Sequence, residues 1–476
     1  MNIIELSAVS LSEGIRSRLF SCREVMIAFL DRIEKVNPKI NAIVSLRGRE
    51  DLIAEAEERD RELDQGMCRG WLHGVPQAVK DLAATRRIPT TLGSPIFREF
   101  RPPENSIMVD RLVEAGAIVI GKTNTPEFGL GSHTYNPVFG ATRNPYDTTK
   151  TAGGSSGGAA AALAARLIPV ADGSDMMGSL RNPAGYNNVI GFRPSYGRVP
   201  SGPAPEIFLD AMATDGPMGR SVRDVAMLLS VQAGYDARAP QSLDGNGSEF
   251  TGALDADMKG KRIGWLGDLD GHLPFEDGVL ELCHGALGVF DTMGAKVEPA
   301  STGFDLESVW RAWVTLRHWR VSGRIGPLYD DPEKRKLLKP EAIWEVEGAK
   351  ALALDDIQAA SGVRSAFHRA MLRLFEKHDF LILPSAQVFP FDVNLDWPKE
   401  IAGRKMDTYH RWMEVVVPVS LLGLPTIAMP AGFSQGGLPM GIPIIGRPRA
   451  DLEVLQIAQA FERATHWLPH KPAIAD

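Results

Sequence analysis

The sequence predicts an α/β protein that folds as one large domain over residues 1–476. Segments with helical periodicity alternate with short apolar runs typical of strands, and no internal repeat or low-complexity tail interrupts them. The chain has 47 glycines and 33 prolines, which supply the tight turns of a large α/β protein. Residues 261–299 show a strand–helix–strand pattern, which predicts a parallel strand pair. Length alone would also allow two or three domains.

Residues 1–70 are predicted to form a helical N-terminal region within that domain. Ser21 and Glu24 have the spacing of a capping box, and apolar residues recur at helical spacing behind them. Because a proline disfavours helical backbone at the residue before it, this helix is expected to end at Asn37 and Pro38.

Residues 303–378 have an almost entirely helical pattern that contains four tryptophans, Trp310, Trp313, Trp319 and Trp344. These side chains suit a hydrophobic core as well as they suit the wall of a pocket. The other expected elements are buried strands at 117–120 and 379–384, helices at 221–232, 277–293 and 452–465, and strands at 261–266 and 296–299.

Composition excludes several classes of function. The net charge of −7 gives no electrostatic reason to expect nucleic acid binding. No segment reaches about 18 uninterrupted apolar residues, and the first ten residues lack the pattern of a secretory signal. Cys22, Cys68 and Cys283 form neither a zinc pattern nor a disulfide framework. We therefore expect a soluble, cytoplasmic protein that does not bind a membrane.

Two clusters of glycine and serine bracket one alanine-rich, helix-like run. Residues 153–158 read Gly-Gly-Ser-Ser-Gly-Gly, and residues 172–179 form a second serine-bearing loop after a strand-like run at 167–171. Such clusters are more often linkers or helix entries than catalytic sites. They can also cradle phosphate, but no G-x-x-x-x-G-K-[ST] motif is present and neither cluster carries a suitably placed lysine.

Three motifs in a fixed order favour a chemical role. Lys80 ends an apolar, strand-like run, the Gly-Gly-Ser-Ser-Gly-Gly cluster follows, and an Asp-x-x-Gly-Ser-x-Arg motif then ends at Arg181. At these residues the chain resembles the amidase signature family of serine hydrolases. The resemblance runs from about residue 5 to the C-terminus and is densest between residues 70 and 200.

The resemblance implies the amidase signature fold, a twisted mixed β-sheet flanked by helices on both faces. It implies that residues 303–378 are the variable region that covers the active site, and that residues 415–430 and 439–446 are the closing strands of the sheet. It also implies a small amide-type substrate and no cofactor. No cluster of histidines and acids has metal-ligand spacing, so no metal is expected.

The family's Ser-Ser-Lys triad maps onto three residues, with Ser179 as the nucleophile, Ser155 as the bridging serine and Lys80 as the base. Ser156 is the obvious rival to Ser155, and the family spacing to Ser179 selects Ser155. The resemblance further implies a cis peptide bond between Gly154 and Ser155. The oxyanion would be held by the backbone N–H groups of Met176, Met177, Gly178 and Ser179.

A lysine acts as a base only when it is largely neutral. Burial disfavours the ammonium form and lowers its pKa, and the apolar run at residues 75–79 is consistent with a buried Lys80. Asp81 would oppose that shift if it lay beside Lys80. We expect the two side chains to point to opposite faces, because they are adjacent in a strand.

The chain departs from the family pattern beside the nucleophile. Met177 replaces a glycine and Met176 replaces a threonine, which should make the pocket more apolar. Asp175 and Arg181 are expected to form a structural pair. The expected substrate contacts are His133, Tyr135, Gly153 and Gly154.

These observations leave three interpretations open. The first is an amidase for an apolar or aryl acyl amide, with esters, anilides and carbamates as further substrates, acting as a monomer or homodimer. The second is a glutaminase-type subunit of an amidotransferase complex, whose small polar substrate would not suit the two methionines. The third is an inactive scaffold, which the presence of all three triad residues disfavours.

Overall fold

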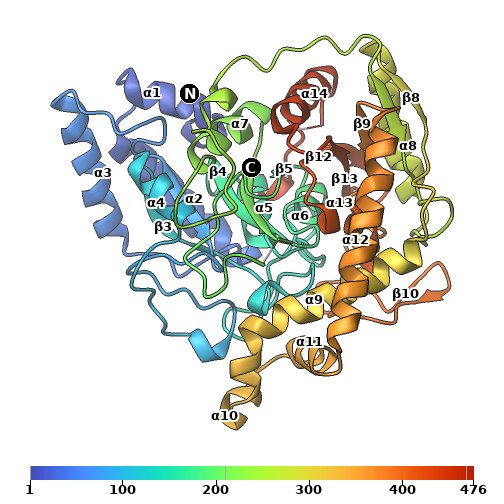
Figure 1. Ribbon diagram of the computed structural model, residues 1–476. Helices are drawn as coiled ribbons and strands as arrows, with labels where there is room; N and C mark the ends of the chain where they lie inside the picture. Colours follow the sequence, from blue (N-terminus) through green and yellow to red (C-terminus); the bar gives the residue numbers. More distant parts are fainter. Residues whose placement is uncertain (1, 210, 468, 476) are drawn as a thin grey trace.

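A computed structural model describes residues 2–209, 211–467 and 469–475 and gives a single α/β domain. A mixed eight-stranded sheet lies at its centre with helices on both faces, as predicted (Figure 1). The strand order is β4-β6-β5-β12-β13-β9-β7-β8. The strands are β4 (Val170–Asp175), β5 (Ile190–Arg193), β6 (Thr214–Gly219), β7 (Arg262–Trp265), β8 (Lys296–Pro299), β9 (Phe380–Ile382), β12 (Thr426–Phe433) and β13 (Pro439–Ile445).

The strand–helix–strand prediction is confirmed at one edge of the sheet. β7 and β8 pair in parallel, and α8 (Val279–Thr292) connects them. β7 also pairs in parallel with β9, whereas the pairs from β4 to β13 are antiparallel.

A small second sheet brings Lys80, a buried residue, to the edge of the large sheet. It has the order β1-β3-β2, and β2 (Pro76–Lys80) runs parallel to β3 (Ile118–Thr123). Its third strand is β1 (Ile43–Val44). The backbone N–H of Lys80 donates to Asp172 Oδ2 in β4 at 3.0 Å, which joins the end of β2 to the edge of the large sheet.

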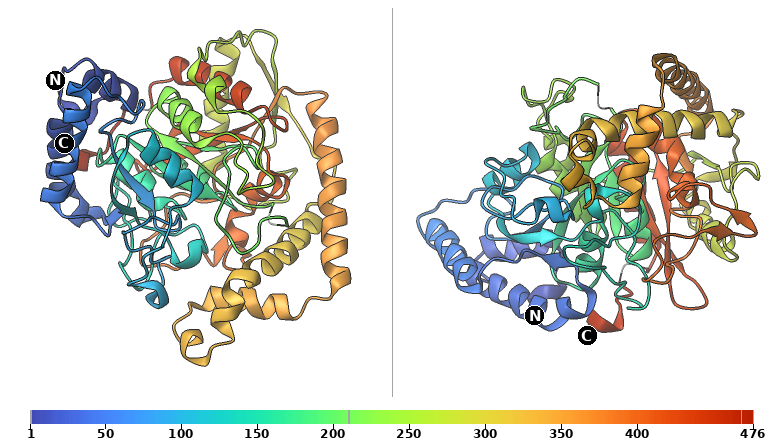
Figure 2. Two further views of the ribbon diagram at one scale, coloured as in Figure 1. Left: turned by 60° about the vertical axis from the view of Figure 1, so that its left-hand side comes forward. Right: turned by 90° about the horizontal axis from the view of Figure 1, so that it is seen from below.

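The N-terminal helices α1 (Ala8–Arg16), α2 (Cys22–Ile40) and α3 (Arg49–Asp64) lie together on one side, and α4 (Ile107–Glu114) lies near them (Figures 1 and 2). The capping box of Ser21 and Glu24 is present at the start of α2. The predicted end of this helix at Pro38 is wrong, because α2 continues to Ile40. Proline removes only one N–H there, and Asn37 accepts bonds from the backbone of Asn41, Ala42 and Ile43.

Two other predicted boundaries shift. Residues 172–175 belong to β4 and are not part of a loop. The closing strand expected from residue 415 begins only at Thr426, after a 3₁₀ turn (Arg411–Val416) and helix α13 (Val417–Leu422). Pro418 suits the first turn of a helix, and Gly423, with φ +66°, ends it.

Helices α9 (Leu306–Tyr329), α10 (Pro332–Arg335), α11 (Pro340–Lys350) and α12 (Leu354–Phe375) follow one another and are coloured yellow to orange in Figure 1. Trp310 and Trp313 are buried in the main core. The remaining helices are α5 (Gly157–Ala164), α6 (Arg181–Tyr186), α7 (Val222–Gln232) and α14 (Asp451–Ala464). Over the described ranges, no helix combines the length and the apolar character that crossing a membrane requires.

Candidate active site

The side-chain nitrogen of Lys80 lies within hydrogen-bond distance of three serines. This Nζ is 2.8 Å from Ser155 Oγ, 2.8 Å from Ser156 Oγ and 3.0 Å from Ser174 Oγ, and the Ser174 carbonyl is at 3.3 Å. The side chain is 1% exposed. An ammonium group has three N–H donors, whereas a neutral amine has two donors and a lone pair that can accept a proton from a hydroxyl.

Burial lowers the pKa of Lys80 to about 7, and the nearby carboxylates of Asp215, Asp172 and Asp175 oppose that shift. Neutral lysine is therefore well populated near neutral pH. Asp81 follows the last residue of β2 and, as predicted, is not among the acids that oppose the pKa shift of Lys80. It accepts bonds from the backbone and hydroxyl of Thr91 and lies close to Lys122.

Ser155 and Ser156 both touch Lys80, but their surroundings differ. They occupy the turn ahead of α5, and the Gly154–Ser155 peptide bond is cis, as the resemblance implied. Ser155 lines a cavity, whereas Ser156 is fully buried and lies near the Ser174 carbonyl. The first turn of α5 packs tightly against the segment after β3, because a Cβ on Gly158 would lie 2.3 Å from the backbone nitrogen of Asn124.

Ser179 is positioned by the turn between β4 and α6. Asp175 accepts from the backbone N–H of Gly178 at 2.9 Å and of Leu180 at 3.1 Å, and it forms the predicted pair with Arg181. Although burial disfavours its charge, the Arg181 and Arg193 guanidinium groups lower the pKa of Asp175 to about 2. A permanently charged carboxylate therefore holds the turn that carries Ser179.

One predicted oxyanion donor is already engaged. The Gly178 N–H donates to Asp175, with φ of +80° at Gly178, so it is bonded within the turn. The backbone N–H groups of Met176, Met177 and Ser179 are the remaining candidates from the predicted set.

Ser155 and Ser179 open into one cavity of about 220 Å³. Its wall is mainly apolar, and Met176 contributes to it, whereas Met177 lies in the core. None of the four tryptophans from α9 and α11 lines it. The apolar lining residues are Leu82, Leu92, Phe97, Phe128, Leu130, Met176, Ala213, Val321, Ile325 and Leu328.

Helix α9 contributes Arg317, Arg320 and Arg324 to the same cavity. The guanidinium groups of Arg317 and Arg320 lie 3.6 and 3.4 Å from the Met176 sulfur. Arg317 also binds Glu345 of α11 at 2.6 Å and the Tyr409 hydroxyl at 2.5 Å. Met176 is thus held against α9 by a buried charged network.

The predictions from sequence missed this network. Its members lie far apart in the chain, and no local pattern marks them as partners. Glu345 is fully buried and also accepts from His318 at 2.8 Å. Burial opposes its charge, but Arg317 and His318 lower the pKa of Glu345 to about 2.

We expect Glu345→Gln to lower the free energy of unfolding by about 3–5 kcal/mol, because it leaves Arg317 as a buried charge without its carboxylate. Urea unfolding measures the change. Glu347→Gln, on the same helix but exposed, is the control and should change stability by less than about 1 kcal/mol. Equal losses in the two variants would contradict this prediction.

The expected substrate contacts lie outside the cavity that holds the serines. The two ring nitrogens of His133 lie 3.0 Å from the Val393 carbonyl and 2.7 Å from the Thr151 hydroxyl. Tyr135 packs against the His133 ring, and the two line a separate small hollow. The carbonyls of Gly153 and Gly154 accept bonds from Thr134 and Ser132. These four residues therefore shape the loop that carries Ser155.

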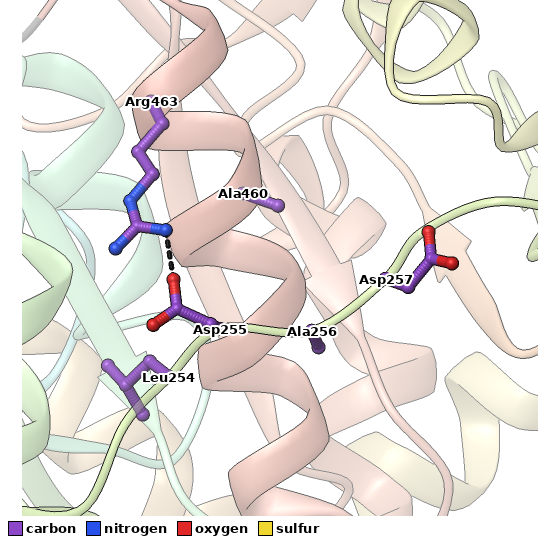
Figure 3. Close-up of a pocket in the computed structure, with 6 residues that line it drawn as sticks. All are labelled: Leu254, Asp255, Ala256, Asp257, Ala460 and Arg463. Atoms are coloured by element: carbon purple, nitrogen blue, oxygen red, sulfur yellow. Dashed lines mark hydrogen bonds and ion pairs between the residues drawn. The ribbon is translucent and has the colours of Figure 1, made fainter.

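A surface hollow of about 280 Å³ lies beside α14. Figure 3 shows Arg463 reaching from this helix to Asp255, while Asp257 lies further along the chain and apart from the pair. Both members of this ion pair are about two-thirds exposed, and no nucleophile lies among the lining residues. The hydroxyl nucleophiles therefore lie at the serine cavity and not at this hollow.

Comparison with known proteins decides the family. The family model described as Amidase matches residues 24–455. The chain belongs to the amidase signature family. It is 34% identical to an acylamidase from Rhodococcus erythropolis over 99% of this chain and 98% of the relative. It is 33% identical to a glutamyl-tRNA(Gln) amidotransferase subunit of Dehalococcoides mccartyi over 99% of this chain and all of that protein.

A solved structure of a bacterial aryl acylamidase of the amidase signature family has the same fold. Its TM-score is 0.91 at 32% identity, with 97% of this chain and 96% of that chain covered. The protein is therefore an amidase signature enzyme that hydrolyses carbon–nitrogen bonds and acts on small amide substrates.

Proposed function

We propose that this amidase hydrolyses amides of apolar or aryl acyl groups through an acyl-enzyme on Ser179. The observation that carries the proposal is the 2.8 Å contact between Lys80 and Ser155, beside a cavity that also contains Ser179 and has an apolar wall. An apolar cavity of about 220 Å³ suits a compact hydrophobic acyl group. The relatives named acylamidase and aryl acylamidase support the same substrate class.

In the first half of the reaction, neutral Lys80 accepts the proton of Ser155, and Ser155 accepts the proton of Ser179. Ser179 Oγ forms a bond to the substrate carbonyl carbon, and the carbonyl electrons move to its oxygen. Backbone N–H groups of Met176, Met177 and Ser179 stabilise that oxyanion. The carbon–nitrogen bond breaks as the relay returns a proton to the leaving amine.

In the second half, water attacks the acyl-enzyme, and the same relay removes its proton. The carboxylic acid leaves, and Ser179 recovers its hydroxyl hydrogen. Lysine can serve as the base because burial keeps much of it neutral. Esters, anilides and carbamates undergo the same acyl transfer and are included in the proposed substrate range.

A panel of p-nitroanilides with small to bulky aryl acyl groups tests the substrate class. We expect the purified chain to prefer apolar acyl groups and to elute from gel filtration as a monomer or homodimer. Its three cysteines are free thiols, which suits the reducing cytoplasm where we infer it acts.

The similarity to a glutamyl-tRNA(Gln) amidotransferase makes glutaminase activity the competing outcome. Activity on glutamine that appears only with partner chains, without turnover of any anilide, would overturn the proposal. Met176 and the aromatic side chains around the serines argue against a small polar substrate.

The pH dependence of kcat/KM follows from Lys80. Because its pKa lies near 7 and only the neutral form accepts a proton, activity should rise with pH through about 7. Below that value it should fall about tenfold for each pH unit. Initial rates with a non-titrating anilide between pH 5 and pH 9 measure the profile, and a flat profile would contradict Lys80 as the base.

A further inference from the structure

A second cavity, lined by Lys80, adjoins the serine cavity and shares Leu82, Leu92 and Ser174 with it. Its volume is about 540 Å³, and Lys80, Asp172, Ser174 and Asp215 line it together with residues of the 196–207 segment. Ser155 and Ser179 line the first cavity and not this one. Lys80 therefore borders a cavity that contains carboxylates, while its Nζ contacts Ser155 of the adjoining serine cavity.

Strand register brings Asp215 to this position. Asp215 of β6 is paired directly with Ser174 of β4. Residues that face each other across an antiparallel pair direct their side chains to the same face of the sheet. Because Ser174 Oγ is 3.0 Å from Lys80 Nζ, Asp215 is on the Lys80 side of the sheet.

Three carboxylates raise the pKa of Lys80, and two of them also accept hydrogen bonds from other groups. Asp175 is paired with Arg181 and accepts two backbone bonds of the serine turn. Asp172 is fully buried and accepts from the Lys80 backbone and the Gln77 side chain. Asp215, which lines the second cavity, differs because within the described ranges its carboxylate accepts no hydrogen bond.

The charges that act on Asp215 come from three elements. Burial disfavours its charge, and Asp172 in β4 raises its pKa further. Lys80 in β2 and Arg324 in α9 act in the opposite direction. Together these effects raise the pKa of Asp215 to about 6. An acid with this pKa is largely ionised above neutral pH, where Lys80 loses its proton.

We propose that Asp215 is a positioning residue, which acts from the second cavity to set the pH at which Lys80 becomes a base. The proposal deepens the proposed function and rests on it for its catalytic meaning. An ionised carboxylate at this place favours the ammonium form and limits the effect of burial on the lysine. Without it, Lys80 would hold a proton less strongly and would be a weaker base once neutral.

The decisive experiment titrates Lys80 directly. Lysine labelled with ¹³C at Cε gives a chemical shift that follows the charge of Nζ, and the Lys80 signal is the one absent from Lys80→Met. We expect Asp215→Asn to lower the pKa of Lys80 by about one pH unit, because a nearby opposite charge is removed. Asp215→Glu keeps the charge and should restore most of the wild-type value.

Glu206→Gln is the matched control. Glu206 lines the same cavity but is not among the acids that act on Lys80, so the lysine should titrate as in the wild type. An unchanged Lys80 titration in Asp215→Asn would overturn the proposal. An equal shift in Glu206→Gln would do so too, since the effect would then belong to the cavity as a whole.

The pH profile of kcat/KM on an anilide gives a second readout. In Asp215→Asn its acidic limb should move to lower pH by the same amount as the Lys80 titration. A merely structural role would lower the rate at every pH without moving the limb. If the wild type hydrolyses no amide, the proposed function fails, whereas the Lys80 titration still decides the role of Asp215.

Discussion

Replacing Ser179 with alanine should lower kcat/KM on an anilide by at least about 10⁴-fold, because no other hydroxyl occupies the nucleophile's position. Ser156 is fully buried and does not line the cavity, and Ser155 is needed to pass the proton to Lys80. Ser179 is 6% exposed and faces the cavity, so alanine should fit without strain. Initial rates and trapping of a covalent acyl-enzyme by mass spectrometry measure the effect.

Ser385→Ala is the matched control for that variant. Ser385 is fully buried, and its hydroxyl has no hydrogen-bond partner among the described residues. Its loss should leave turnover within about twofold of the wild type, because it removes no buried hydrogen bond. Activity that survives in Ser179→Ala would identify another residue as the nucleophile.

Lys80→Met should lower kcat/KM by about 10³–10⁴-fold, because the relay then ends at Ser155 without a base. The same change should relieve a cost to stability. Folded Lys80 titrates near pH 7, whereas in the unfolded chain it titrates near its ordinary value of 10.5. Between these values the unfolded state binds more protons, so the stability of the wild type rises with pH.

The cost of burying the ammonium group is therefore fully present below pH 7 and gone above about 10.5. The excess in free energy of unfolding of Lys80→Met over the wild type should therefore shrink by about 5 kcal/mol between pH 7 and pH 10.5. Denaturant unfolding at several pH values measures it. A stability difference that does not change with pH would show that Lys80 is not buried as an amine.

Lys122→Met is the control for the loss of activity. Lys122 is the other fully buried lysine of the small sheet, and burial lowers its pKa to about 8. It donates to the Ala83 carbonyl and the Thr85 hydroxyl, away from the reacting serines. The folded fraction of this variant should retain turnover. Equal loss in both variants would mean that the sheet, and not the relay, was damaged.

Features that depend on neighbouring residues were predicted well. The capping box of Ser21 and Glu24, the parallel pair of β7 and β8, and the absence of Asp81 from the acids that act on Lys80 follow from local geometry. The predictions failed where local rules compete. Pro38 is tolerated in the last turn of α2, and residues 417–422 form a helix although their apolar character suits a strand.

By itself, the sequence determined the α/β class, the family and the residues proposed as the catalytic triad, since these depend on motifs and spacing along the chain. Only the tertiary structure decided which side chains surround them. Arg317 contacts both Glu345 and Met176, and strand pairing places Asp215 opposite Ser174, on the Lys80 side of the sheet. His133 contacts the Val393 carbonyl and lies outside the serine cavity. Strand register and helix packing join residues distant in the chain, and local periodicity carries no information about those pairings.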